Sequence, residues 1–378
     1  MKKEKIGLAI IILGLLISII FAIHTIDKKN QIEKALQEGK ISYKEAGWYE
    51  KLENNSVRCK LCPNKCTIGE GQRGICQVRE NIKGTLYSLV YGNPVSIAVD
   101  PIEKKPLYHF LPGSKAYSLA TAGCNVDCKY CQNWDIAHRK PEELTSTPLS
   151  PEGVVQEAIS KNAEVIAFTY NEPTVWYEYM YDIAKIAKEK GLKTAVISNG
   201  YINQEPLKEL LPYIDAYKID LKSFNEQTYE TLIEGQIEPV LQSIKTISQS
   251  STWLELVYLV VPTYTDNVDE IKSMCEWIKK EIGDSVPIHF SRFWPKYRLT
   301  NLPPTPEETI KKARSVCLET GLKYVYTGNI QDIEGSTTFC PENNQPLLIR
   351  NNYSIEKNLI EKDGLAKDCK EKIPGVWK

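Results

Sequence analysis

The chain has 378 residues, of which 42% are hydrophobic and 25% are charged. This length and composition exclude a disordered or collagen-like protein and allow either two domains or one large one. The 47 basic and 48 acidic side chains leave a formal net charge of -1, so a generally basic nucleic-acid-binding protein is disfavoured and no nucleic-acid partner is indicated. The 11 cysteines are odd in number and scattered, which matches a secreted disulfide scaffold poorly and favours metal or redox chemistry in a reducing compartment.

The N-terminal segment has the character of a membrane anchor. An uncharged apolar run from Ile6 to Ile23, extendable to Ile26, meets the length of a spanning helix, and no clear cleavage site precedes Asp27. We therefore expect one transmembrane helix within residues 1–26 and a single-pass protein of the cell membrane, with a charged linker over residues 27–50. A cleaved signal peptide is the alternative. Lysines flank both ends of the run, so charge alone does not orient it.

Residues 116–330 alternate short β-rich runs with amphipathic helical runs. Ser150, Asn267 and Thr305 are expected to cap helices that start just after them. The alternation predicts a parallel sheet covered by helices, either open or curled into a barrel. Residues 51–115 precede it as a cysteine-rich module, and residues 331–378 follow it as a tail. The predicted strands are Tyr117–Ala120, Val165–Thr169, Thr194–Ile197, Ala216–Asp220, Leu254–Val261, Ile288–Ser291 and Tyr324–Tyr326.

Three cysteines follow the first of these strands directly. Cys124, Cys128 and Cys131 have the spacing Cys-x3-Cys-x2-Cys. Three thiolates this close can bind three irons of a cubane cluster, and the fourth iron then stays open. An open coordination position is what distinguishes a catalytic metal site from a structural one. A zinc site completed by a distant ligand and a set of inert thiols are the alternatives.

With Tyr130 before its third cysteine, this loop resembles that of the radical S-adenosylmethionine (radical SAM) enzymes. The segments Asp100–Pro106, Tyr108–Phe110 and Cys131–Trp134 resemble the radical enzyme of the AmmeMemoRadiSam system, which is related to pyruvate formate-lyase activating enzymes. The resemblance covers roughly residues 55–378. It implies a partial (β/α) TIM-type barrel and two cofactors, a 4Fe-4S cluster and S-adenosylmethionine.

The resemblance also implies a reaction. Reductive cleavage of S-adenosylmethionine would give a 5′-deoxyadenosyl radical that abstracts hydrogen from an unidentified substrate, with an electron donor of the flavodoxin or ferredoxin type. The substrate or partner would be a protein or another component of an AmmeMemoRadiSam system. Because S-adenosylmethionine is an intracellular metabolite, we expect the catalytic domain to face the cytoplasm. The alternatives are a glycyl-radical-enzyme activase and a non-catalytic, membrane-bound iron–sulfur or zinc protein.

The cofactor contacts that the resemblance implies fall at the ends of predicted strands, where a barrel of this kind builds its site. Glu172 would accept hydrogen bonds from the cofactor's ammonium group. Ile197 replaces an aspartate of the activating enzymes, which puts their cation site in doubt here. The alternatives are a solvated loop position for Glu172, an ordinary turn at Ser198 and Asn199, a structural ion pair between Asp220 and Lys222, and a core position for His289. The implied cofactor-binding residues are Tyr130, Glu172, Ser198, Asn199, Asp220, Lys222 and His289.

Eight more cysteines lie outside this loop. Four of them, in a Pro- and Gly-rich stretch, make a second four-thiolate set that fits either structural zinc or a second iron–sulfur cluster. This set consists of Cys59, Cys62, Cys66 and Cys76. The resemblance implies that Cys340 and Cys369 are remnants of a tail zinc site, because Asn343 and Lys372 stand where further cysteines are expected. Cys275 and Cys317 lie on apolar helical faces and are predicted to be plain core residues.

Overall fold

The computed structural model describes residues 42–378. The predicted anchor, residues 1–26, lies outside the described residues. None of the helices in the described range combines the length and the apolar character that a membrane span needs. The prediction of a transmembrane fold, and with it the predicted membrane localisation and cytoplasmic orientation, is therefore corrected: an apolar run can satisfy the length requirement, but it does not by itself establish a span. The α/β part of the prediction stands.

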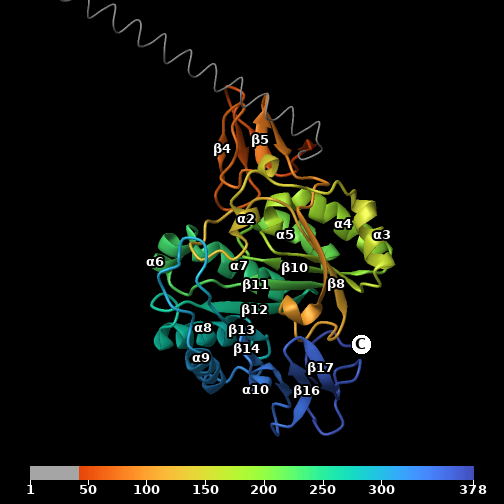
Figure 1. Ribbon diagram of the computed structural model, residues 1–378, viewed down its shortest axis with the longest axis vertical. Helices are drawn as coiled ribbons and strands as arrows, with labels where there is room; N and C mark the ends of the chain where they lie inside the picture. Colours follow the sequence, from red (N-terminus) through yellow and green to blue (C-terminus); the bar gives the residue numbers. More distant parts are fainter. Residues whose placement is uncertain (1–41) are drawn as a thin grey trace, which may run out of the picture.

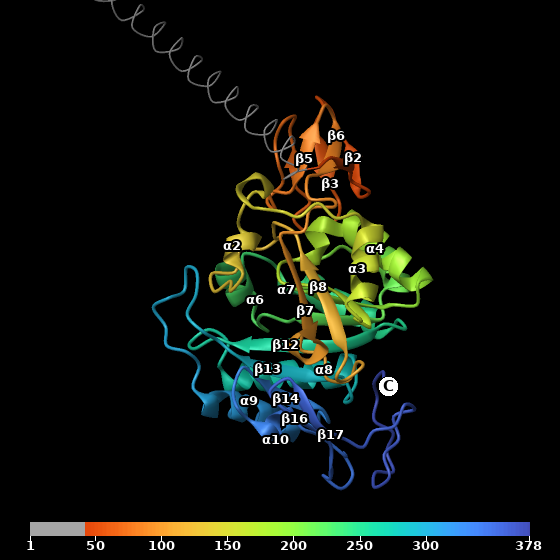
Figure 2. The same ribbon diagram turned by 45° about the vertical axis from the view of Figure 1, so that its right-hand side comes forward.

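An eight-stranded sheet forms the centre of the molecule, in the order β14-β13-β12-β11-β10-β9-β8-β7. Strand β7 is antiparallel to β8, and the strands from β8 to β14 are parallel to their neighbours. Because β7 and β14 stand at opposite ends of this order, the sheet is open. It is strongly twisted, with β8 steep and β12 nearly horizontal in both views (Figures 1 and 2). All seven predicted strands are confirmed within a few residues.

The strands of this sheet are β7 (Ser96–Pro101), β8 (Lys115–Ala120), β9 (Val165–Phe168), β10 (Lys193–Ser198), β11 (Ala216–Asp220), β12 (Trp253–Val260), β13 (Ile288–Arg292) and β14 (Val325–Gly328). The helices that connect and cover them are α3 (Pro151–Ser160), α4 (Tyr177–Glu189), α5 (Gln204–Leu210), α7 (Ile237–Ser248), α8 (Val268–Glu281) and α9 (Glu307–Glu319). Shorter helices are α2 (Trp134–Ala137), α6 (Glu226–Thr228) and α10 (Ile333–Ser336). Single 3-10 or π turns cover Ile102–Lys104, Pro141–Glu143, Pro173–Trp176, Leu211–Tyr213 and Tyr229–Ile233.

The central sheet is buried on both faces, which explains why its strands are almost continuously apolar. In β9, Ile166 and Phe168 pack into the large core that contains the covering helices. The alternate residues Val165 and Ala167 pack on the other face, as the two-residue period of a strand requires. That other face carries several small side chains, on which Ile102, Leu107 and Phe110 pack: Ala116, Ala167, Ala195 and Ala216.

Two of the three predicted helix caps are confirmed. The Ser150 hydroxyl accepts the backbone N–H of Gly153 (3.1 Å), and Asn267 accepts two N–H groups at the start of α8. The predicted cap at Thr305 is wrong. Its buried hydroxyl donates to the carbonyl of Val260 (2.6 Å) and accepts the N–H of Phe293 (3.1 Å), because the end of β12 and the end of β13 use it instead of α9.

Two small antiparallel sheets, β1-β6-β5 and β2-β3-β4, form a module at one end of the molecule (Figures 1 and 2). Strands β1 and β2 fall in the segment 27–50 that we expected to be a linker, and β7 belongs to the main sheet although it falls in the predicted module. These strands are too short to show a hydrophobic period. Their bounds are β1 (Lys44–Glu45), β2 (Tyr49–Lys51), β3 (Val57–Cys59), β4 (Thr67–Ile68), β5 (Arg79–Ile82) and β6 (Thr85–Ser88).

The tail folds as a third small antiparallel sheet of β15 (Thr338–Phe339), β16 (Pro346–Asn351) and β17 (Ser354–Asn358). It lies at the opposite end of the molecule from the N-terminal module (Figure 1). An aromatic and aliphatic cluster joins it to the edge of the main sheet, with Tyr326 of β14 and Trp377 among its buried members.

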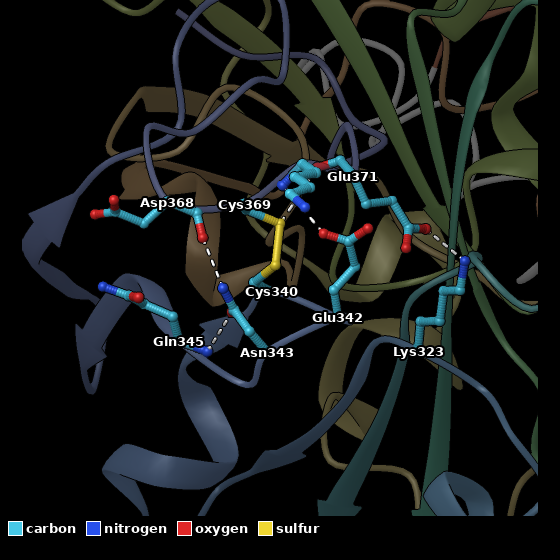
Figure 3. The surroundings of a disulfide bond; sticks show 9 residues. Lys323, Cys340, Glu342, Asn343, Gln345, Asp368, Cys369 and Glu371 are labelled. Atoms are coloured by element: carbon cyan, nitrogen blue, oxygen red, sulfur yellow. Dashed lines mark hydrogen bonds and ion pairs between the residues drawn. A yellow bond between two sulfur atoms is a disulfide. The ribbon is translucent and has the colours of Figure 1, made fainter.

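Four of the cysteines pair in two disulfides. Cys275 of α8 is bonded to Cys317 of α9, with their Cα atoms 5.4 Å apart, so these residues are buried as predicted but are not free core thiols. Cys340 is bonded to Cys369 (Figure 3), with Cα atoms 5.8 Å apart. Neither disulfide was predicted from the sequence, because the paired cysteines are 42 and 29 residues apart and no local spacing links them.

Candidate active site

The side chains that the sequence singled out come together in one cavity of about 1650 Å³. It lies over the carboxyl ends of the parallel strands, where a sheet of this topology brings its loops together. All predicted ligands of the catalytic cluster and of the cofactor line it: Cys124, Cys128, Cys131, Tyr130, Glu172, Ser198, Asn199, Asp220, Lys222 and His289.

The loop that carries the three cysteines is held at both ends by the loop after β9. Asn171 Nδ2 donates to the carbonyls of Thr121 (2.9 Å) and Gly123 (2.8 Å), just before the first cysteine. Asn133 Nδ2, just after the third cysteine, donates to the carbonyl of Tyr170 (2.6 Å). Backbone carbonyls of the two loops are thereby satisfied and the position of the cysteines is fixed.

Cys124, Cys128 and Cys131 are free and line the cavity, Cys128 buried and the other two partly buried. Burial raises the pKa of the Cys128 thiol to about 12. Their three sulfur atoms do not lie within 4.8 Å of one another, so they do not close around a single ion. The neighbouring Tyr130 hydroxyl is buried and has no hydrogen-bond partner among the described residues, which leaves a donor for a bound group.

Glu172 organises the turn that follows β10. Its Oε1 accepts the N–H of Thr174 (3.0 Å) and the hydroxyl of Ser198 (2.7 Å), and its Oε2 accepts the N–H of Asn199 (2.8 Å). Burial raises the pKa of this carboxyl group. A carboxylate has about four acceptor positions, so Glu172 keeps capacity for a cationic group in the cavity while it fixes its neighbours.

Asn199 connects this turn to the cysteine loop. Its Nδ2 donates to Oδ1 of Asn125 (2.9 Å), and its own Oδ1 accepts the N–H of Tyr201 (2.8 Å). Asn125 in turn donates to the carbonyl of Tyr201 (2.7 Å). Asn125 was missed by the sequence analysis, and its place between two cluster cysteines was the one signal that could have found it.

Strand β11 contributes a row of charges. Asp220 forms ion pairs with Lys218 and with Lys222, the latter at 3.4 Å. Burial acts to lower the pKa of Lys222, but the Asp220 carboxylate and the nearby Cys128 thiol hold it well above its usual value. Lys218 was missed, although the two-residue period of a strand places it on the same face as the two residues that were named. The row has a net positive charge beside the cysteines.

His289 of β13 is held by a buried carboxylate. Its Nε2 donates to Oε2 of Glu255 (2.8 Å), and burial lowers the pKa of the imidazole. Glu255 also accepts the backbone N–H groups of Tyr108 (3.0 Å) and His109 (2.8 Å). His289 lines the cavity, whereas Glu255 orients it from behind and was not singled out by its sequence.

Comparison with known proteins places these observations in a family. The family model described as the Radical SAM superfamily matches residues 118–278, which contain the three-cysteine loop and the strands from β8 to β12. This chain belongs to the radical SAM superfamily. It is 46% identical over 327 residues, 86% of this chain and 97% of the other, to an uncharacterized protein, MJ0808, of Methanocaldococcus jannaschii.

Further relatives are activating enzymes. The chain is 23% identical over 220 residues, 54% of this chain and 89% of the other, to the pyruvate formate-lyase 1-activating enzyme of Escherichia coli. A solved domain of a pyruvate formate-lyase-activating enzyme from Bacteroides vulgatus is similar with a TM-score of 0.38 and 19% identity, over 43% of this chain and 98% of that one. Membership of the radical SAM superfamily implies a 4Fe-4S cluster and S-adenosylmethionine, and the three spread thiols with the unpartnered Tyr130 hydroxyl fit such a group.

One more cluster in this radical SAM cavity comes from outside the predicted strands. Asp100 at the end of β7 accepts hydrogen bonds from Lys105 (2.6 Å) and from the hydroxyl of Tyr170 (2.5 Å). These contacts hold the pKa of the Asp100 carboxyl well below its usual range against the opposing effect of burial. Lys105 and Tyr170 line the cavity. Asp100 and Lys105 lie in a segment that carries the family resemblance, but their sequence alone indicates no role for them.

His109 has a structural position. It is buried, its Nδ1 donates to the carbonyl of Pro374 (2.7 Å), and its Nε2 accepts the Tyr326 hydroxyl (2.6 Å). It does not line the cavity. His109 therefore fastens the C-terminal segment to the edge of the main sheet.

The two tail cysteines, which the resemblance implies are remnants of a lost zinc site, lie together but are joined in a disulfide. Sulfur atoms of Cys340 and Cys369 and a carboxylate oxygen of Glu342 lie within 4.8 Å of one another, but the two sulfurs are bonded to each other (Figure 3). A cysteine binds a metal as a thiolate, and a disulfide sulfur is not one. Asn343 instead links the two turns, because its Nδ2 donates to the carbonyl of Asp368 (2.7 Å).

Proposed function

We propose that this radical SAM protein binds a 4Fe-4S cluster through Cys124, Cys128 and Cys131 and cleaves S-adenosylmethionine reductively to abstract hydrogen from a substrate. The observation that carries the proposal is the convergence of these three thiols with Glu172, Asn199 and the charged row of β11 in one cavity. Superfamily membership supports the same chemistry.

The cavity has room for more than the cofactors. Its volume of about 1650 Å³ exceeds that of a usual small-molecule site, about 300–1,000 Å³. A site this large can hold the cluster, S-adenosylmethionine and the reacting part of a substrate together. This supports a reaction in which hydrogen is abstracted inside the cavity.

When bound, the cluster supplies the electron that splits S-adenosylmethionine into methionine and a 5′-deoxyadenosyl radical, which abstracts hydrogen. The chain's own groups bind and orient. Glu172 accepts hydrogen bonds from the ammonium group of the methionine part, and Ser198 and Asn199 are kept in place for its carboxylate or ribose by their bonds to Glu172. Lys222 and Lys218 offer positive charge to a carboxylate, with Asp220 setting their positions.

His289 and Tyr130 complete the proposed cofactor site. Burial favours the neutral ring of His289, and the bond from its Nε2 to Glu255 leaves Nδ1 as a hydrogen-bond acceptor. Tyr130 offers its unpartnered hydroxyl. The bond to Glu255 fixes the orientation of His289, which favours one orientation of the bound cofactor.

The substrate and partners belong to the same proposal. We infer a one-electron donor of the ferredoxin or flavodoxin type and a substrate of the AmmeMemoRadiSam type, on the basis of the segment from Asp100 to Trp134. The similarity to a pyruvate formate-lyase activating enzyme favours a second candidate, the formation of a glycyl radical on a partner protein. Incubation with a glycyl-radical enzyme separates the two, since only the second candidate gives the EPR doublet of a glycyl radical.

The test of the shared chemistry is anaerobic. The full chain is reconstituted with iron and sulfide, reduced with dithionite and supplied with S-adenosylmethionine, and 5′-deoxyadenosine is quantified by liquid chromatography. We expect product from the wild type and a loss of at least about 100-fold in Cys128→Ala, because one iron loses its ligand. An intact cluster that forms no 5′-deoxyadenosine would refute the proposed function.

A matched control removes cysteines outside the cavity. The double variant Cys340→Ala/Cys369→Ala loses two cysteines and the tail disulfide, and it should retain product formation. If it lost activity as completely as Cys128→Ala, the loss would not report on cluster ligation.

A further inference from the structure

The four free cysteines of the N-terminal module line a second cavity, which is separate from the catalytic one. Its volume is about 20 Å³, which is enough to hold about one water molecule. The N-terminal module and the main α/β domain both contribute to its wall, because Thr174 and Val175, which follow β9, also border it. The four cysteines are Cys59, Cys62, Cys66 and Cys76.

The backbone around these cysteines is fixed. Cys59 at the end of β3 donates its N–H to the carbonyl of Cys66 (3.0 Å). Asn203 Nδ2 donates to the carbonyls of Lys60 (2.6 Å) and Cys62 (3.1 Å), which ties the first cysteine turn to the loop before α5. These bonds hold the backbone that carries Cys59, Cys62 and Cys66, and all four thiols line the same cavity.

The spacing of the sulfur atoms distinguishes the two metal centres that four thiolates can hold. No three of these four sulfurs lie within 4.8 Å of one another. A tetrahedral zinc with bonds of about 2.3 Å draws every pair of its thiolates to about 4 Å and leaves no room for a water-sized sphere between them. A cubane cluster binds each thiolate to a different iron, so its thiolates stand about 6 Å apart. The sulfur atoms of the three catalytic cysteines likewise do not all lie within 4.8 Å of one another.

Arg79 supplies a second, independent observation. Its side chain lines the cavity and is 2% exposed. Nη1 and Nη2 of Arg79 donate to the two carboxylate oxygens of Glu178 at 3.1 and 2.6 Å. The Nε of Arg79 has no hydrogen-bond partner among the described residues. A buried N–H without an acceptor is costly, and an anionic metal–thiolate centre with bridging sulfides would accept it.

We propose that Cys59, Cys62, Cys66 and Cys76 hold a second cubane 4Fe-4S cluster, coordinated entirely by the protein. Such a cluster would lie against the catalytic loop. A Cβ on Gly123, the residue before Cys124, would stand 2.7 Å from the carbonyl oxygen of Cys76, so the two cysteine sets are separated by little more than a backbone. This assignment does not depend on the cleavage of S-adenosylmethionine.

For the test, the full chain is isolated anaerobically, without reconstitution, from cells grown with both iron and zinc, and its iron, sulfide and zinc contents are measured. The triple variant Cys124→Ala/Cys128→Ala/Cys131→Ala removes the catalytic cluster. We expect it to retain about four irons and about four sulfides per chain, with an EPR signal after reduction by dithionite. One zinc per chain without iron, or no metal at all, would overturn the proposal.

The wild type gives a second measurement that does not depend on the folding of a variant. It should contain about eight irons per chain, and the matched variant Cys59→Ala/Cys62→Ala about four. A wild type with about four irons and one zinc contradicts a second cluster. A wild type with eight irons that forms no 5′-deoxyadenosine contradicts the proposed function and leaves the second cluster supported.

Discussion

His109 and His289 are both buried and both contact Glu255, one through its backbone and one through its ring. The His289 ring lines the catalytic cavity, whereas the His109 ring is enclosed by Pro374 and Tyr326. Both imidazoles are neutral because burial lowers their pKa. The partner of each ring nitrogen therefore decides whether the histidine faces the catalytic cavity or only stabilises the fold.

The position of His109 predicts a pH dependence of stability. Burial lowers its pKa to about 4 from an ordinary value of 6.5. Between these pH values the unfolded chain binds a proton that the folded chain does not, so the free energy of unfolding falls as the pH falls. The loss from this group approaches about 3 kcal/mol at the acid end of the window. Urea titrations from pH 7.5 to pH 4 measure it.

His109→Gln is the variant that isolates this contribution. It should be less stable than the wild type at pH 7.5, because the ring bonds to Pro374 and Tyr326 are lost, but its stability should fall less steeply toward pH 4. Parallel pH profiles of the two proteins would show that His109 is not the titrating group.

The elements illustrate how one sequence pattern can have two outcomes. Ser150 and Thr305 each precede a proline and a helix, but only Ser150 caps its helix. Thr305 is fully buried between the ends of β12 and β13, and its hydroxyl is used there. A local signal is overridden where a strand end leaves buried backbone groups that need a partner.

Substitution by aspartate, itself a good cap, separates these roles. Ser150→Asp should leave the free energy of unfolding within about 0.5 kcal/mol of the wild type, and Ser150→Ala should cost about 1 kcal/mol. Thr305→Asp should cost at least about 3 kcal/mol, because it places a carboxylate at a fully buried position. Urea titration at pH 7.5 gives all three values. A harmless Thr305→Asp would mean that Thr305 does cap α9.

For the whole molecule, the arrangement of the two cysteine sets depends on the packing of the N-terminal module against the main α/β domain. Gly123 marks this junction. Its φ of 94° favours glycine, and an added Cβ would also stand 2.7 Å from the carbonyl oxygen of Cys76 and from a methyl group of Val78. The module and the catalytic loop can approach this closely only because no side chain separates them.

Gly123→Ala should therefore destabilise the protein much more than a matched glycine substitution. Gly191 also has a left-handed φ, 75°, but an added Cβ there meets nothing within 4 Å. Gly191→Ala should lower the free energy of unfolding by about 1 kcal/mol, through backbone strain alone. Gly123→Ala should lower it by at least about 3 kcal/mol, because its Cβ also clashes with the backbone of the module. Thermal unfolding of both apoproteins measures the difference. Equal losses would mean that the junction can move apart.

The sequence by itself determined the alternation of strands and helices, the three-cysteine loop after β8 and the polar residues at the strand ends. These features depend on local spacing and on the rule that parallel strands bring their carboxyl ends to one edge. The same local reasoning predicted a membrane anchor outside the described residues that the structure does not support. An apolar run of suitable length is a necessary condition for a span, and it is not a sufficient one.

Only the tertiary structure decided which distant groups meet. It paired Cys340 with Cys369, placed Asp100 and Lys105 beside Tyr170, and set Glu255 behind His289. These contacts join residues that are far apart along the chain, and no local period or spacing encodes them. They form because buried polar groups must find partners once the chain has closed around them.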